Sequence, residues 1–437
     1  MPRSLSPTST AARRRTDAPS PNAMKKKRLT LSPAPPDYAA GGDLLRVLCV
    51  FMIGWYHIWQ QSWLSPVLKL NGFRLDLTCP VRAGYMFVDL MLLLSGFLVY
   101  LPYANDAARP AGEFYLKRAL RILPSYWFCL AVMLYLALTD PNGLPTQRVL
   151  LDLLAHLGFV HNLFLRTYTN TCMNVVLWTL AVEVQFYLVL PVLAPAFRKR
   201  PILCWAAMTG AAFSFRYLWT LPMEDTTLFV NRLPNMLDVY ATGMLAAHLY
   251  VRLARAKRGR AIIAALGTLA FAAGLWGIWR LLRGQAFVSG YDLLRAGQLT
   301  RRLPMAFCGA GVLLGGSLSF RPLRALCSNR VVRWLSGVSF NFYIWHQWLA
   351  VKLKAWHIPP YTAELPNQAS EQPWQLQYTL LCFAAALALA ALVTYVVEKP
   401  CARLGRSWLK RLEARRKPVS EPNPHTLDNN EPEADPQ

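Results

Sequence analysis

The sequence predicts an all-α fold, a polytopic transmembrane helix bundle. Hydrophobic residues make up 54% of the 437 residues and charged residues only 16%, and apolar runs of about 20 residues recur between positions 44 and 397. A run of that length can cross the hydrocarbon core of a bilayer as a helix. The net charge of +24 does not indicate nucleic-acid binding, because Lys and Arg concentrate in the two tails and in short clusters between apolar runs.

The chain divides into three parts. Residues 1–42 are rich in Ser, Pro, Ala and basic residues and lack an apolar period, so we expect a disordered cytoplasmic arm. Residues 43–403 contain the apolar runs and form the expected transmembrane domain. Residues 404–437 are basic and then acidic and Pro-rich, which predicts a disordered, solvated cytoplasmic tail. No cleavable signal peptide is expected, because the first apolar run is long enough to remain as an anchor.

We expect ten membrane-spanning helices and one further apolar segment that does not cross. The further segment, residues 149–165, contains Asp152, His156, His161 and Asn162, so hydropathy alone leaves its course undecided. The ten expected spans are 44–63, 84–103, 121–138, 175–195, 202–221, 233–251, 261–282, 303–319, 334–353 and 376–397.

The distribution of basic residues decides the topology. The clusters at 117–121 and 198–200 both fall on the cytoplasmic side only if residues 139–174 begin and end outside. Residues 149–165 are therefore expected to form a re-entrant or interfacial helix. Both chain termini are then cytoplasmic. The loop 283–302 is an exception to the charge rule, because it is basic and yet falls outside.

The cysteines give little functional information. Most of the nine lie in or beside apolar runs, where a small buried side chain is the simplest interpretation. Cys79 and Cys172 fall in expected outer loops, where they could pair if that compartment is oxidising. The sequence has no CxxC, no Cys/His cluster with zinc spacing and no nucleotide-binding glycine motif. No metal site is predicted.

Three arginines are expected at the cytoplasmic ends of helices. Arg46 lies at the start of the first span, and Arg118 and Arg121 share a helix face at the start of the third, because three residues separate them. Two interpretations compete. The guanidinium groups can reach lipid phosphates and fix the orientation of the helices, or they can converge on an anionic ligand that enters from the cytosol.

Ionisable residues also fall deep inside the expected spans. A rise of 1.5 Å per residue places His57 about 20 Å and His346 about 18 Å above the cytoplasmic side, and Glu183 about 12 Å below the outer side. Asp89 is expected near the outer end of the second span and Ser95 near its middle. A Ser in such a helix usually bonds to a carbonyl of its own helix. The ionisable groups are costly in lipid and should therefore face one polar interior.

Such an interior suits two classes of function. A transporter or proton pump uses buried His and carboxylate groups as relays. An enzyme uses a His as general base and a carboxylate to orient it. The arginines favour the enzyme, because a phosphate-bearing donor bound at the cytoplasmic side would need a path to the basic residue.

Six short motifs follow one another along the chain. They are Arg46 with His57 eleven residues later, FVDLMLLLSGFLV at 87–99, FYLKRALRILPSYW at 114–127, WTLAVEVQFYLVLP at 178–191, GVSFNFYIWHQWL at 337–349 and VVEKP at 396–400. Their order resembles that in the membrane-bound acyltransferase 3 family, integral-membrane O-acyltransferases that modify bacterial cell-surface glycans. Thr179 stands where Ser is usual in that family, and Phe340 where Tyr is expected.

The resemblance implies an enzyme that moves an acyl group, expected to be acetyl, from cytoplasmic acyl-coenzyme A to a hydroxyl of a cell-surface or exported glycan. Arg46, Arg118 and Arg121 would hold the nucleotide phosphates of the donor. His57 would deprotonate the acceptor hydroxyl or carry the acyl group transiently.

Other polar residues would support these. Asp89 or Glu183 would orient the His57 ring and stabilise its cation. His346 is either catalytic or a structural polar contact. Three further residues are expected to give polar support: Ser95, Trp178 and Tyr187.

The expected protein is a multi-pass protein of the bacterial plasma membrane. It would have no permanently bound cofactor, acyl-coenzyme A as co-substrate, and a glycan or lipid-linked sugar as acceptor. No hydrolase-like domain follows the last expected span, which predicts a stand-alone transferase. The alternative is a multi-span transporter that exports a small anion or an acylated product. The sequence leaves open the acyl chain, the acceptor and the oligomeric state.

Overall fold

The computed structural model describes residues 38–70, 73–106, 110–223 and 225–416. Most of the expected N-terminal arm, and the expected tail from residue 417 on, lie outside the described residues. Residues 404–416 continue a helix, so the helical part of the chain extends past the boundary expected at residue 403.

The described chain is almost entirely helical. Its α-helices are α2 (Ala40–Ser62), α3 (Thr78–Arg82), α4 (Phe87–Ala104), α5 (Ala111–Thr139), α6 (Thr146–Leu157), α7 (Leu165–Tyr168), α8 (Trp178–Lys199), α9 (Pro201–Phe215), α10 (Leu237–Arg255), α11 (Arg260–Gln285), α12 (Tyr291–Leu318), α13 (Arg321–Cys327), α14 (Arg330–Ala355), α15 (Trp374–Val393) and α16 (Lys399–Arg416). Short 3₁₀ or π turns are η2 (Gly84–Met86), η3 (His161–Leu163), η4 (Val175–Leu177), η5 (Arg216–Thr220), η6 (Leu233–Met236) and η7 (Thr394–Glu398). Strands β1 (Val67–Leu70) and β2 (Phe73–Asp76) pair as an antiparallel hairpin.

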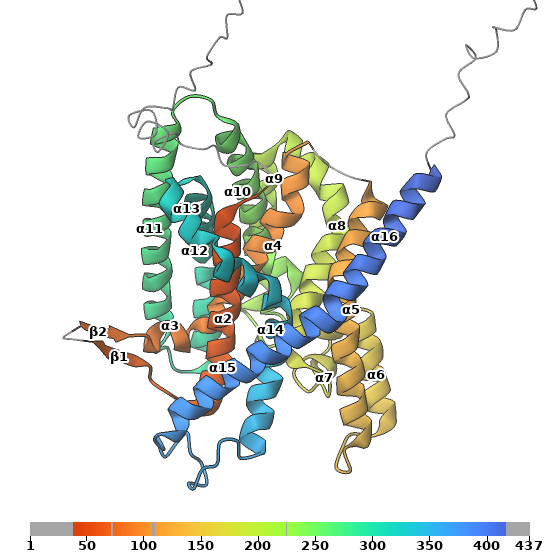
Figure 1. The fold of residues 1–437 in the computed structure, drawn as a ribbon, viewed down its shortest axis with the longest axis vertical. Coiled ribbons are helices and arrows are strands. Elements are labelled where there is room, and N and C mark those ends of the chain that lie inside the picture. Colours follow the sequence, from red (N-terminus) through yellow and green to blue (C-terminus); the bar gives the residue numbers. More distant parts are fainter. Residues whose placement is uncertain (1–37, 71–72, 107–109, 224, 417–437) are drawn as a thin grey trace, which may run out of the picture.

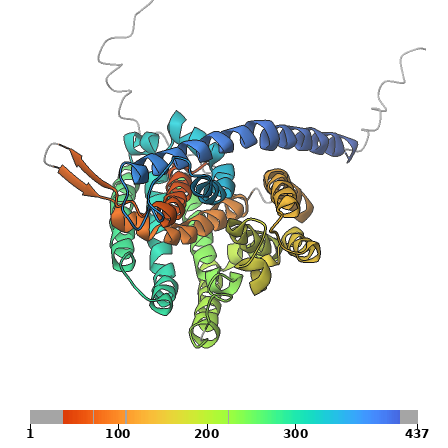
Figure 2. The ribbon, with the colours of Figure 1, turned by 90° about the horizontal axis from the view of Figure 1, so that it is seen from below.

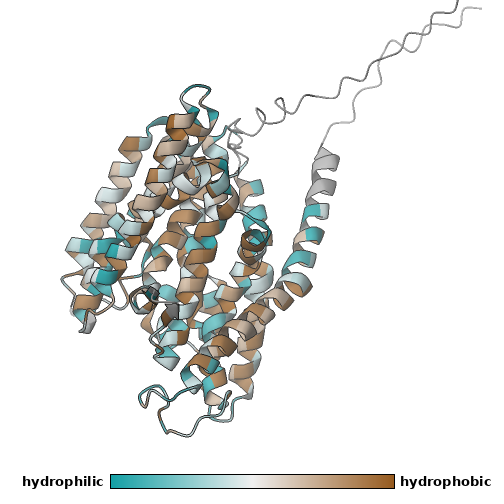
Figure 3. Cartoon of the chain, turned by 60° about the vertical axis from the view of Figure 1, so that its left-hand side comes forward, coloured by the Kyte–Doolittle hydropathy of each residue, from teal (hydrophilic) through white to brown (hydrophobic). Residues whose placement is uncertain are grey.

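The helices surround a central α2. This helix packs against α14, α12 and α4, whereas α11 lies at one edge of the bundle and α5 with α6 at the other (Figure 1). The continuous helix α15–η7–α16 runs along one side, and the β hairpin projects from an edge (Figure 2). Hydrophobic residues predominate along the helices and hydrophilic residues gather in the loops at the ends (Figure 3). This is the surface pattern of a helical membrane protein.

Five helical segments of the described chain are long and apolar enough to cross a membrane by themselves: Gly84–Ala104, Ala111–Thr139, Val175–Lys199, Arg260–Gln285 and Trp374–Ser407. The bent pair Asp292–Leu318 and Arg321–Ala355 counts as a sixth. The prediction of a helical membrane protein is confirmed, but these segments are fewer than the ten expected. The central helix α2 is not among them because polar residues such as Arg46 and His57 lower its mean hydropathy.

Helix α6 covers most of the segment that was expected not to cross. It has 12 residues, or about 18 Å of rise, which is shorter than the hydrocarbon core of a bilayer. Its polar residues Asp152 and His156 are buried, whereas Leu150, Leu151 and Leu154 are exposed. The helix therefore turns its polar side toward the protein and its apolar side outward.

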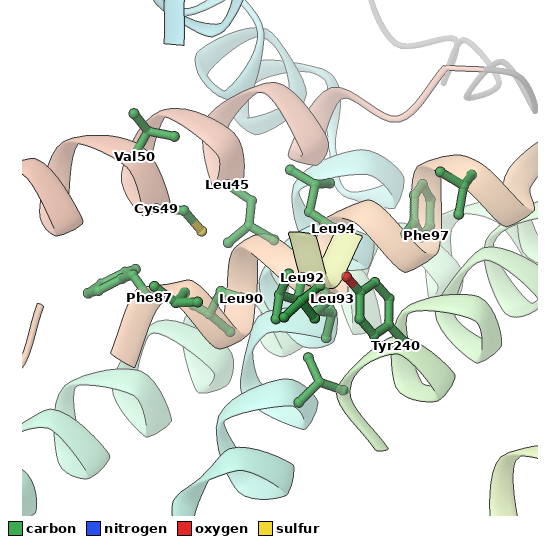
Figure 4. Packing of buried hydrophobic residues seen from close by; sticks show 14 of the residues in the cluster. Leu45, Cys49, Val50, Phe87, Leu90, Leu92, Leu93, Leu94, Phe97 and Tyr240 are labelled. Carbon is green, nitrogen blue, oxygen red and sulfur yellow. The ribbon is translucent and has the colours of Figure 1, made fainter. Parts of the chain in front are cut away.

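Small residues allow the helices around the core to approach closely. A Cβ atom at Gly243 of α10 would lie 2.1 Å from the Leu93 carbonyl oxygen of α4, and one at Gly96 would lie 2.7 Å from the Tyr240 carbonyl oxygen. Close approach at glycines is a common way to pack helices in membranes. The buried side chains of α2 and α4 and the Tyr240 ring then fill the space between the helices (Figure 4).

Two buried ion pairs join α4, α10, η5 and α12. Arg302 Nε lies 3.2 Å from Asp89 Oδ1, and Arg216 Nη2 lies 3.1 Å from Asp238 Oδ2. All four side chains are at most 1% exposed. Arg302 also donates to the Val230 carbonyl at 2.7 Å. The pairs thus neutralise four charges inside the bundle and fix the loop before α10.

Asp89 gives a direct test of this network. In Asp89→Asn the Arg302 guanidinium stays buried without its counter-charge, and removal of one partner of a buried pair costs about 3–5 kcal/mol. We expect a clearly lower melting temperature of the purified protein in detergent. The exposed pair Arg198–Asp106 supplies the control, because Asp106→Asn should cost at most about 1 kcal/mol. Equal melting temperatures for Asp89→Asn and the unmodified protein would contradict the role assigned to the pair.

Candidate active site

The three predicted arginines line one cavity. This cavity, called here the arginine cavity, has a volume of about 330 Å³ and is bounded by α2, α4, α5, α8 and α14. Arg46, Arg118 and Arg121 face it together with the single carboxylate of Glu183. Three guanidinium groups against one carboxylate make the cavity electropositive, which suits an anionic ligand.

Arg46 is held by a polar network at the start of α2. Its Nη1 donates to Ser336 Oγ at 3.2 Å, and the Ser336 hydroxyl donates to Asp43 Oδ1 at 3.2 Å. Ser328 Oγ donates to the other Asp43 oxygen at 2.7 Å, and Tyr38 also donates to it. Asp43 was missed by the sequence analysis, although an acidic residue three positions before an arginine in an apolar run was a usable signal.

Glu183 belongs to the arginine cavity. Ser95 Oγ donates to Glu183 Oε1 at 2.5 Å, and the Tyr187 hydroxyl donates to the same oxygen. Tyr187 is in turn near Arg118, whose guanidinium carbon lies 5.7 Å from the centre of its ring. The expectation that Ser95 bonds to its own helix is therefore wrong, because its hydroxyl bridges α4 to α8.

A second cavity contains His57. This histidine cavity has a volume of about 280 Å³. Its aromatic wall consists of Tyr56, Tyr85, Tyr168 and Trp178, and its polar wall includes Asn231, Arg295, Gln298 and Gln347. Flat aromatic faces beside amide and guanidinium groups suit a ligand that combines apolar faces with hydroxyl groups.

The His57 ring is oriented by a neighbour on its own helix. His57 Nδ1 lies 2.8 Å from Gln60 Oε1, and Gln60 Nε2 donates to the Tyr56 hydroxyl at 3.0 Å. In this arrangement the amide oxygen of Gln60 faces the imidazole. An amide oxygen only accepts hydrogen bonds, so with this partner the proton sits on Nδ1 and Nε2 keeps its lone pair. This is the tautomer that a general base requires.

His346 lies beside His57. The centres of the two rings are 5.2 Å apart. His346 is fully buried, and its Nδ1 donates to the Tyr343 carbonyl at 2.7 Å, whereas its Nε2 has no hydrogen-bond partner within the described part of the chain. Gly54 of α2 permits this approach of α2 to α14, because a Cβ atom there would lie 2.6 Å from the Phe342 ring.

The expected contact of a carboxylate with His57 is not present. Asp89 pairs with Arg302 and lines neither cavity, and Glu183 bonds to Ser95 and Tyr187 in the arginine cavity. The hydrogen bond to the His57 ring comes from Gln60 instead. Depth along a helix could not reveal this, because it does not fix the direction in which each side chain points.

The other residues singled out in the sequence are Trp178 and two cysteines. Trp178 lines the histidine cavity, and its ring makes an edge contact with Tyr168. Cys79 and Cys172 are both free thiols. Burial and the hydrogen bond to Asp152 raise the pKa of Cys172 to about 12. Within residues 38–70, 73–106, 110–223 and 225–416, no cluster of three or more His, Cys, Asp or Glu residues could hold a metal ion.

Comparison with known proteins identifies the family. The acyltransferase 3 model, described as an acyltransferase domain, matches residues 40–396. The chain is 32% identical over 179 residues to nodulation protein 10 of Rhizobium leguminosarum bv. viciae, over 36% of this chain and 44% of that protein. It is 23% identical over 393 residues to the peptidoglycan O-acetyltransferase OatA of Listeria monocytogenes serovar 1/2a, over 84% of this chain and 56% of that protein.

A further relative is the O-acetyltransferase OatA of Staphylococcus aureus strain NCTC 8325, which is 28% identical over 167 residues, or 36% of this chain and 24% of that protein. The chain spans about half the length, or less, of these curated relatives. No solved structure matches it. The family model covers most of the chain and confirms the resemblance read from the six motifs. The chain therefore belongs to the acyltransferase 3 family, and residues 40–396 are its acyltransferase domain.

Proposed function

We propose that this protein is a membrane-bound O-acyltransferase that moves an acyl group, expected to be acetyl, from cytoplasmic acyl-coenzyme A to a hydroxyl of a cell-surface or exported glycan. The observation that carries the proposal is the adjacency of two cavities of different chemistry. One gathers three guanidinium groups, and the other holds His57, whose Nδ1 pairs with the Gln60 amide and whose Nε2 is the proposed base. Relatives that are named peptidoglycan O-acetyltransferase and O-acetyltransferase support the reaction class.

The arginine cavity is the proposed donor site. Coenzyme A carries several phosphate groups, and guanidinium groups bind phosphate oxygens in a bidentate manner. Arg46 is already oriented by the Asp43 and Ser336 network, so little side-chain freedom would be lost on binding. The lining also includes apolar side chains, among them Leu94, Leu98 and Leu180, which suit the pantetheine arm and the thioester.

The histidine cavity is the proposed acceptor site. His57 Nε2 takes the proton of the acceptor hydroxyl while the hydroxyl oxygen attacks the thioester carbonyl carbon. The carbon–sulfur bond then breaks, the coenzyme A thiolate leaves, and the proton on His57 returns to that sulfur. The products are an ester of the glycan and free coenzyme A. The aromatic and amide groups of this cavity would hold the sugar in place.

The proposed topology has ten spans with both termini in the cytoplasm of a bacterial cell. Each of the ten expected apolar runs coincides with a helix in the described chain. The first residues of α2 and the last described residues of α16 lie toward the same end of the bundle (Figure 1). Helix α6 is too short to add a crossing. The arginine cavity then opens toward the donor side and the histidine cavity toward the acceptor side.

Replacement of His57 tests the reaction. General acid–base catalysis contributes about 10²- to 10⁴-fold, so we expect His57→Ala to lose at least about 100-fold in acyl transfer from radiolabelled acetyl-coenzyme A. His357→Ala is the matched control, because His357 is exposed beyond α14 and lines neither cavity. A transporter would leave the thioester intact in every variant. Full activity of His57→Ala would refute the proposed base.

Replacement of Arg118 tests the donor site. Loss of a hydrogen bond to a charged group costs about 1.5–3 kcal/mol, so Arg118→Ala should raise the KM for acetyl-coenzyme A about 10- to 100-fold. The KM for the acceptor should stay unchanged. Arg258→Ala at an exposed position outside both cavities should change neither value. An unaltered donor KM in Arg118→Ala would favour a purely lipid-facing role for this arginine.

Replacement of Gln60 tests the orientation of His57. In Gln60→Leu the imidazole loses the acceptor that holds the proton on Nδ1, so kcat should fall about tenfold or more while both KM values stay similar. Gln60→Glu keeps an acceptor oxygen at the same place and should recover much of the loss. Parallel losses in the Leu and Glu variants, or a change in KM alone, would show that the hydrogen bond has no positioning role.

A further inference from the structure

A layer of side chains, called here the wall, separates the two cavities, and one of its residues lines both of them. Tyr343 of α14 lines the arginine cavity and also the histidine cavity, and no other residue of the described chain does so. The wall is thin. On α4, Val88 faces the histidine cavity and Met91 the arginine cavity, and these positions differ by less than one helical turn.

The start of α8 shows the same division. Trp178 lines the histidine cavity, and the next residue, Thr179, lines the arginine cavity. Along α14, Phe340 faces the arginine cavity and Gln347 the histidine cavity, with Tyr343 between them. Three helices thus pass from one cavity to the other at one level of the bundle, where the Tyr343 side chain lies.

The Tyr343 phenol is held by hydroxyl and carbonyl groups of the neighbouring segment. Thr179 Oγ1 donates to the Tyr343 hydroxyl at 2.9 Å, and the Tyr343 hydroxyl donates to the Val176 carbonyl at 3.3 Å. The side chain is buried. These bonds join α14 to η4 and α8 across the wall. These two bonds hold the tip of the ring in the wall.

We infer that Tyr343 controls passage between the two cavities. While its hydroxyl is bonded to Thr179 and Val176, the ring keeps the donor thioester apart from the acceptor side. When the ring leaves this position, the cavities join and the thioester reaches His57. This inference rests on the proposed function, because only a transferase needs the two compartments to meet during each turnover.

Separation of the cavities has a chemical purpose. A thioester that is open to the outer solution can be lost to water, since water competes with the acceptor hydroxyl as nucleophile. Exclusion of water from the reacting group prevents this side reaction. Tyr343 would therefore set the ratio of acyl transfer to hydrolysis and act as a specificity-determining residue that does not itself take part in the chemical step.

Cysteine labelling tests the wall without any need for catalysis. A reporter cysteine is placed at Met91, which lines the arginine cavity close to the wall. Right-side-out vesicles are treated from the outer side with a membrane-impermeant, negatively charged methanethiosulfonate. Labelling at position 91 is read by peptide mass spectrometry, which separates it from the nine native cysteines. Inside-out vesicles report whether the reporter reacts from the donor side.

With Tyr343 in place, we expect slow labelling of Met91→Cys from the outer side and rapid labelling from the donor side. The double variant with Tyr343→Ala should be labelled at least about tenfold faster from the outer side. Tyr217→Ala is the matched control, because Tyr217 is about half exposed and lines neither cavity. Equal outer labelling with and without Tyr343→Ala, or rapid outer labelling with Tyr343 intact, would overturn the inference.

Thr179 provides a second variant that keeps the packing of the wall. Thr179→Val removes the donor to Tyr343 and preserves the shape of the side chain, whereas Thr179→Ser preserves the hydroxyl. For Thr179→Val we expect faster labelling of position 91 from the outer side and a higher ratio of hydrolysis to acyl transfer. For Thr179→Ser we expect both quantities to stay close to those of the unmodified protein. Identical behaviour of the two variants would count against the hydroxyl contact. If neither the unmodified protein nor any variant transfers acyl groups but the labelling follows this pattern, the role of Tyr343 between the cavities is supported and the proposed function is refuted.

Discussion

The structure depends on the neutralisation of charge inside a bundle that faces lipid. The Arg302–Asp89 and Arg216–Asp238 pairs are almost fully shielded from solvent, and an unpaired charge at such a depth would be very costly. Arg302 does more than pair, because its Nη2 also donates to Asn231 Oδ1 at 3.1 Å. Asn231 lines the histidine cavity. The charge pairs therefore stabilise the same loop that shapes one wall of the candidate acceptor site.

The two cavities divide the polar residues by chemistry. In the arginine cavity, three guanidinium groups lie around the Glu183 carboxylate, which accepts a hydrogen bond from Ser95. The direct neighbours of the His57 ring are an amide and a second imidazole, since Gln60 Oε1 lies 2.8 Å from its Nδ1 and the centre of the His346 ring lies 5.2 Å away.

The sequence was sufficient for the helical class and the helix positions, and it offered the convergence of Arg46, Arg118 and Arg121 as one of two interpretations. Apolar runs determine where helices form, and a spacing of three residues determines that two arginines share a face. Side-chain partners across helices could not be predicted. Asp89 was expected near His57 because both were placed toward the outer side of the membrane, but depth carries no information on helix rotation or neighbour order. Gln60 was overlooked because a neutral amide at the end of an apolar run gives no distinctive signal.

The contact between α2 and α14 links the two halves of the site. Helix α2 brings Arg46 to one cavity and His57 to the other, about 16 Å apart along the helix. Helix α14 carries Tyr343 in the wall and His346 beside His57. Gly54 sets the distance between these helices, because any larger side chain there would meet the Phe342 ring. Because Tyr343 and His346 lie on the same helix, a rotation of α14 against α2 would move the wall and the histidine pair together.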